Sequence, residues 1–343
     1  MAIETDFSFA QVIPKMAAFA PGDLLGPLRR MVWPKPADPK QDAKRKWKGH
    51  GFNLIWRPNF DGEFGAKEFF LQLNLTDEEL DFTEITGTGI ANRSFFEHTI
   101  TLGGIAYTQA IKDSFDQSGQ HFEPGVWAHV PQTTNPKEPS TIVRMGSIPH
   151  GTTINLQGTA KGPVATKPTF DPASITPFII GSPDDGKSGL VSHPNEEDLN
   201  KPSKSRTERK RLATLTPDHL KNPNLFLSDA LAKQTVLNTT VLSLTSDTSP
   251  ASSVPHEGGG TSNIAFLTGS SPPAGGPNAL SHVVTTTFWI EQVRDEYGAE
   301  FTQMQYTQRV LLHFNGLSWP HITVATLRPV PSSSGGPYDD GAR

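Results

Sequence analysis

His282–Val293 reads HVVTTTFWIEQV, and Glu300–Gly316 reads EFTQMQYTQRVLLHFNG. A short polar stretch, 294–299, separates the two runs and has the composition of a turn. β-Branched and aromatic residues dominate the first run. In the second run apolar residues such as Met304 and Tyr306 alternate with mostly polar ones, as in a strand with one buried face. The stretch therefore predicts an antiparallel hairpin.

The same strand signal extends outward from this hairpin in both directions. A further run, His321–Leu327, follows it. Eight short runs precede it, separated by Gly, Pro, Asn and Asp: Lys48–Arg57, Glu68–Asn74, Glu78–Thr86, Ser94–Leu102, Ile105–Asp113, Gly119–Val130, Ser140–Ile148 and Thr152–Gly158. No helical period lies between these runs, so antiparallel pairing is favoured over βαβ units. The sequence predicts an all-β fold with one antiparallel barrel of about ten strands, whose closure removes sheet edges and leaves a mouth for one small ligand.

The remaining segments organise the chain around this barrel. Residues 1–46 are rich in proline and predict an irregular lead-in with a short helix over Leu24–Met31. We place the barrel domain at 47–330, interrupted by an insertion of loops and a short helix at 161–280, where proline recurs and apolar residues are sparse. Residues 331–343 have the composition of a disordered tail.

Composition excludes several classes of function. The 343 residues contain no cysteine, which rules out disulfides, thiolate nucleophiles and thiolate-ligated metals. The net charge of −5 argues against non-specific binding to nucleic acid. The sequence has no apolar run long enough for a transmembrane helix and no secretory signal at its start, so we expect a cytoplasmic protein that does not bind membranes. It also has no P-loop, HExxH or GxSxG motif.

Histidine is the residue type that points to chemistry, with eleven in the chain. His321 begins the last strand run and shares one face with Thr323 and Ala325, whose small side chains leave room for a planar ligand. An imidazole at the start of a strand can equally bond a backbone carbonyl or water. His313, on the preceding strand, competes with His321 as a ligand if it also faces inward.

Four segments, in this order, resemble the nitrobindin-like haem proteins of the calycin barrels. They are Trp47–Phe52, His121–Trp127, Met145–Gly158 and Pro320–Arg328. The resemblance covers about half of the chain, and the 161–280 segment has no counterpart in it. It implies a b-type haem (iron protoporphyrin IX) with His321 as the metal ligand. Nε2 of that histidine would bind the iron, while a backbone or carboxylate acceptor would hold the other nitrogen.

Further site residues follow from placement around such a haem. His150, in a Pro-His-Gly turn, would lie over the opposite face and transfer protons, with Arg144 as a second catalytic candidate. The residues expected to line the cofactor pocket are Tyr107, Trp127, Met145 and Trp319. The implied activity is peroxidase-like, or directed at reactive nitrogen or oxygen species, with a small-molecule oxidant as partner.

Two other functions remain open at this point. The same barrel could carry a lipid or another apolar small molecule without any metal. Alternatively, the insertion could dock a partner or a second copy of the chain in a homo-oligomer. The basic run Lys204–Arg211 is read as a solvated surface rather than a nucleic-acid site, because the chain as a whole is acidic.

Overall fold

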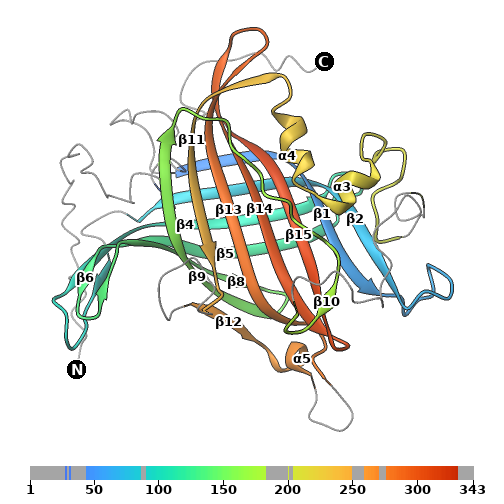
Figure 1. The fold of residues 1–343 in the computed structure, drawn as a ribbon, viewed down its shortest axis with the longest axis horizontal. Helices are drawn as coiled ribbons and strands as arrows, with labels where there is room; N and C mark the ends of the chain where they lie inside the picture. Colours follow the sequence, from blue (N-terminus) through green and yellow to red (C-terminus); the bar gives the residue numbers. More distant parts are fainter. Residues whose placement is uncertain are drawn as a thin grey trace, which may run out of the picture.

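The computed structural model describes Leu28, Met31, 44–85, 90–182, Asn200, 204–248, 259–269 and 276–330. Ten long antiparallel strands form a closed barrel in the order β1 (Lys44–Pro58), β2 (Phe69–Glu84), β4 (Ile100–Asp113), β5 (Gly119–Val130), β8 (Thr141–Ile148), β9 (Thr152–Val164), β11 (Gln234–Thr245), β13 (Leu280–Asp295), β14 (Glu300–Phe314) and β15 (Leu317–Pro329) (Figure 1). The barrel closes because β1 pairs with β15 as well as with β2, with Trp47 opposite Pro329 and Ile55 opposite His321. The predicted all-β barrel is confirmed.

Short elements decorate this barrel. The additional strands are β3 (Ile90–Asn92), β6 (Thr133–Thr134), β7 (Lys137–Glu138), β10 (Phe178–Ile179) and β12 (Gly260–Asn263). The labelled helices are α3 (Pro217–Lys221), α4 (Leu225–Ala230) and α5 (Ala265–Thr268). Among the residues that the structure describes, no helix is long and apolar enough to cross a membrane.

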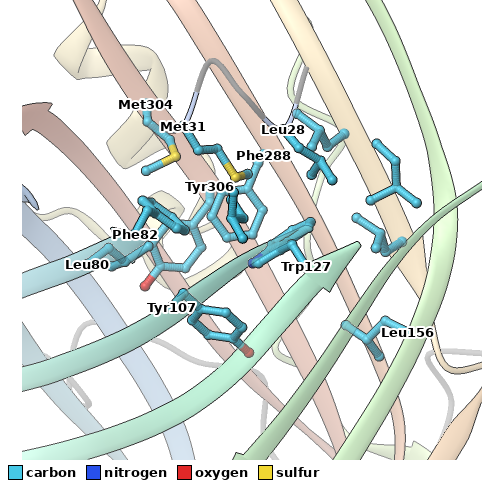
Figure 2. Packing of buried hydrophobic residues seen from close by; sticks show 14 of the residues in the cluster. Leu28, Met31, Leu80, Phe82, Tyr107, Trp127, Leu156, Phe288, Met304 and Tyr306 are labelled. Atoms are coloured by element: carbon cyan, nitrogen blue, oxygen red, sulfur yellow. The ribbon is translucent and has the colours of Figure 1, made fainter. Parts of the chain in front are cut away.

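Inward-facing apolar side chains fill one half of the barrel. Strand alternation brings Trp47, Trp127 and Phe288 into a single buried cluster. Leu28 and Met31, two described residues of the lead-in, are fully buried in the same cluster, and Figure 2 shows them among its aromatic side chains. The indole Nε1 of Trp47 donates a hydrogen bond to the backbone carbonyl of Met31, at 2.6 Å. The lead-in therefore supplies part of the core, which the sequence did not predict.

A second apolar cluster lies between the outside of the barrel and the segment that follows β9. Outward-facing residues of β1 and β15, such as Leu54 and Ile322, pack against Leu215, Leu220 and Leu227 in and before α3 and α4. Figure 1 accordingly shows these two helices outside the wall, near β1, β2 and β15. Helices α3 and α4 thus reinforce the wall from outside and do not enter the inner core.

The segment predicted as an insertion, 161–280, also enters the wall itself. It contains β11, which pairs with β9 on one side and β13 on the other. Before α3, the backbone N–H of Thr207 donates to the carbonyl of Leu73 on β2, so part of the basic run 204–211 lies along the barrel. Arg206, in this run, is buried over the ring of Phe64. The predicted tail, 331–343, and most of the predicted lead-in lie outside the described residues.

Candidate functional site

The half of the barrel that the core leaves open holds a cavity of about 420 Å³. A given strand serves both halves: on β15, Ala325 and Leu327 belong to the core, whereas His321 and Thr323 line the cavity. The apolar part of the lining comprises Ile55, Ile111, Ile148, Leu267, Ala279, Val310 and Leu312. This volume and mixture of groups are typical of a site for one small organic molecule.

Helix α5 lies at the mouth of the cavity, where its Leu267 joins the lining. Its approach depends on Gly151, which has a φ of +119° and follows His150 in the β8–β9 turn. A Cβ at this glycine would lie 2.6 Å from the side chain of Ile264 and 3.0 Å from that of Leu267. The predicted Pro-His-Gly turn therefore packs directly against the element that borders the mouth.

His321 stands on the β15 wall with its ring held by the neighbouring strand. Its Nε2 lies 2.8 Å from Oδ1 of Asn53 on β1, and the hydroxyl of Thr323 donates to the same oxygen, also at 2.8 Å. An amide oxygen only accepts, so Nε2 carries the proton and Nδ1 keeps a lone pair. Burial lowers the pKa of His321 to about 3, and the nearby imidazoles of His121 and His150 lower it further in the same direction. The ring is therefore neutral at physiological pH.

The identity of the bonded nitrogen differs from the expectation. We expected Nε2 to be free for a metal and the other nitrogen to be held. In the structure Nε2 is the held nitrogen, and its acceptor is the side-chain amide of Asn53 rather than a backbone carbonyl or a carboxylate. His313, the competing candidate, does not line this cavity; it stacks on His282 with ring centroids 4.3 Å apart.

Two more histidines line the cavity from β5 and from the β8–β9 turn. The rings of His121 and His150 stack with centroids 5.6 Å apart. Nε2 of His121 lies 3.2 Å from a carboxylate oxygen of Glu123, which fixes that ring as well. Burial and the charge of His121 lower the pKa of His150. Sequence reasoning named His150 but missed His121 as a cavity residue, although the alternation Trp127, Glu123, His121 along β5 places all three on the inner face.

A buried ionic layer lies directly beneath the cavity. Arg144, which is 1% exposed, donates to Glu123 at 2.8 Å, to the hydroxyl of Tyr107 at 3.0 Å and to Gln308 at 2.7 Å. Tyr107 also donates to Glu123. Burial would raise the pKa of Glu123, but Arg144 and His121 outweigh it and hold the pKa at about 2. Arg144 is therefore already neutralised and reaches the cavity only through residues such as Gln308.

A second buried carboxyl approaches the cavity floor through Tyr306. The Tyr306 hydroxyl donates to Glu78 at 2.5 Å and accepts from Gln109 at 2.9 Å, and both Tyr306 and Gln109 line the cavity. Burial raises the pKa of Glu78 to about 7, against the opposing effect of its hydrogen bonds. No local pattern of the sequence predicts this pair, because its members are 228 positions apart.

The other predicted pocket residues lie away from the cavity. Tyr107 and Trp127 face inward but belong to the core beneath the cavity floor. Met145 faces outward from β8 and is 39% exposed, because its neighbour Arg144 takes the inward position. Trp319 is buried in the outer cluster, where its ring stacks on Phe314 with centroids 4.8 Å apart. Of the predicted site residues, His321 and His150 are those that the structure brings to the cavity.

The described residues contain no cluster of three or more His, Asp or Glu side chains arranged to hold a metal ion. This finding does not bear on a haem, for which a protein commonly supplies one axial histidine. The neutral imidazole of His321, with one nitrogen anchored and the other carrying a lone pair, fits that requirement.

Fold and cavity together define the class: a closed antiparallel β-barrel with a ligand-sized cavity at one end. No protein-family model matches the chain, and no curated protein matches it. Among solved structures, the crystal structure of Rv2717c from M. tuberculosis is similar at 12% sequence identity, covering 83% of this chain and 91% of that one, with a TM-score of 0.34. A likeness this distant adds nothing to the fold and the site described above.

Proposed function

We propose that the cavity binds a flat, largely apolar ligand and that this ligand is haem b, with His321 as its axial ligand. The observation that carries the proposal is the state of His321: a neutral imidazole in an apolar-lined cavity, with one nitrogen bonded to Asn53 and the other unprotonated. Metal-ligating histidines almost always donate their second ring N–H to a protein acceptor in this way. The absence of cysteine leaves histidine as the natural axial ligand.

The residues of the chain have separable tasks in this proposal. Asn53 and Thr323 fix the orientation and tautomer of His321. The aliphatic lining restricts water at the site and favours a hydrophobic ring system. A haem held by one histidine supplies redox chemistry towards peroxides or nitrogen oxides. His150 is the candidate for proton transfer because its lowered pKa keeps it neutral and able to accept a proton.

Titration with hemin tests the proposal. We expect the wild-type protein to develop a sharp Soret band at one hemin per chain. The His321→Gly variant should lose it and regain it when imidazole is added to replace the missing side chain. The matched control is His50→Ala, because His50 is exposed on the outer face of β1. A wild-type protein that binds no hemin overturns the proposal, and a His321→Gly variant with an unchanged spectrum overturns the ligand assignment.

A metal-free carrier of an apolar molecule is the second candidate. The observation that favours it is the aliphatic part of the lining, formed by residues such as Ile111, Ile148 and Val310, which suits an apolar molecule without any use of His321. Organic extraction of the purified protein, followed by mass spectrometry, separates the two functions. Porphyrin in the extract supports the haem protein, whereas a lipid without porphyrin supports the carrier.

A further inference from the structure

The charge carried by the described residues of the cavity lining is of one sign, positive. Among the described residues that line the cavity, Arg57 is the only lysine or arginine, and none is an aspartate or glutamate. His321 is neutral because burial lowers its pKa. A ligand that enters this cavity therefore meets a permanent positive charge with no competing carboxylate in the described lining.

The geometry of Arg57 leaves most of its hydrogen-bonding capacity unused. Arg57 is exposed near the end of β1, where the strand reaches the mouth. Its Nη1 donates to Oε1 of Gln72 at 2.9 Å and to the hydroxyl of Ser205 at 3.4 Å. Within the described parts of the chain, its Nε and Nη2 make no hydrogen bond and no carboxylate pairs with the side chain.

The partner of Arg57 is itself fixed in place. Gln72 is buried, and its Nε2 donates to Oδ1 of Asn74 at 2.7 Å. One edge of the guanidinium is thus anchored to a rigid side chain, while its remaining N–H groups have no partner among the described residues. A guanidinium presents its N–H groups as a planar fork that matches the two oxygens of a carboxylate.

We propose that Arg57 binds a carboxylate of the cavity's ligand, so that the ligand is an amphiphile with its apolar body inside the barrel and its acidic group at the mouth. This inference rests on the proposed function in that it assumes the same cavity is occupied. Arg144 cannot take this role, because Glu123 already neutralises it beneath the cavity floor. The propionates of a haem and the headgroup of a fatty acid share the required chemistry.

Paired acids and esters test the carboxylate directly. Binding of hemin and its dimethyl ester is measured by quenching of tryptophan fluorescence, and binding of palmitate and methyl palmitate by calorimetry. We expect the wild-type protein to prefer the acid of at least one pair by about tenfold, the size of one charged hydrogen-bonded contact at a partly exposed site. In Arg57→Gln the acid and the ester should bind equally, with ester affinity unchanged, and Arg57→Lys should retain part of the preference. Arg294→Gln, which removes an exposed arginine of β13 that pairs with Glu300, is the matched control.

The outcomes separate this inference from the proposed function. An acid preference that survives in Arg57→Gln, or an equal loss of acid and ester binding, overturns the role of Arg57. Binding of palmitate but not of the porphyrin, with dependence on Arg57, supports the carboxylate site and contradicts the haem. If none of the four compounds binds the folded wild-type protein, both proposals are overturned.

Discussion

Substitution of Glu78 by glutamine should remove a large pH dependence from the stability of the barrel. Glu78 is 1% exposed, and it accepts hydrogen bonds from the hydroxyls of Tyr306 and Thr76 and from the side chain of Gln109. No described cation pairs with this carboxyl, because Arg144 is bonded to Glu123. Burial raises the pKa of Glu78 from 4.5 to about 7 in the folded protein.

The sign and size of the pH dependence of stability follow from this pKa. A carboxyl whose pKa is higher in the folded state binds its proton more tightly there, so stability falls as the pH rises from about 4.5 to about 7. Each pH unit in this window is worth about 1.4 kcal/mol, which gives a total loss of about 3 kcal/mol for Glu78. The glutamine variant resembles the protonated acid, so it should be more stable than the wild type by about this amount at pH 8 and nearly equal to it at pH 4.

Urea unfolding between pH 4 and pH 9 measures this effect. Glu291, whose pKa burial also raises to about 7, lies on the outer side of β13 and adds a similar slope that Glu78→Gln should leave in place. The exposed neighbour Glu79, which pairs with Lys46 and Lys48, provides the control, and Glu79→Gln should keep the wild-type pH slope through this window. Equal pH slopes in wild type and Glu78→Gln would refute the assignment of a buried, unpaired carboxyl at this position.

Three further predictions follow from the same structure. Met31→Ala should destabilise the barrel by about 2–5 kcal/mol, seen as a lower urea midpoint, because Met31 is fully buried in the inner core. Arg144→Met should lower the free energy of unfolding in urea by about 3–5 kcal/mol, because it leaves the buried Glu123 charged and without its cation. An unchanged urea midpoint would show that Arg144 and Glu123 do not form the buried ion pair described. Asn53→Leu should remove the acceptor for Nε2 of His321. The ¹⁵N chemical shifts of that ring in long-range ¹H–¹⁵N spectra should then differ from those of the wild type, which should show the single tautomer protonated at Nε2.

The sequence predicts the barrel, and the two-residue period of a strand shows which residues share a face. It did not settle which face is inward on β8, where Met145, predicted to line the pocket, faces outward and Arg144 faces inward. The alternation His321, Thr323, Ala325 places all three residues inside the barrel, as observed. Alternation says nothing about height along the barrel axis, which depends on strand tilt and register. Tyr107 and Trp127 therefore face inward but lie below the cavity floor.

Contacts between distant segments could not be read from the sequence either. Glu78 meets Tyr306, and Asn53 meets His321 across 268 positions, only because the barrel closes between β1 and β15. The contribution of Met31 to the core was hidden by the proline-rich composition of the lead-in, which indicates irregular backbone but not its burial. These are tertiary effects that no local pattern of residue types encodes.

The most direct test of the central claim is to locate iron in a crystal of the protein grown with hemin, using anomalous diffraction at the iron absorption edge. We predict a single strong peak inside the barrel, at bonding distance from a ring nitrogen of His321, with His121 and His150 on the opposite side. A cavity without an iron peak, or iron bound elsewhere while the Asn53–His321 hydrogen bond stays as it is here, would contradict the account.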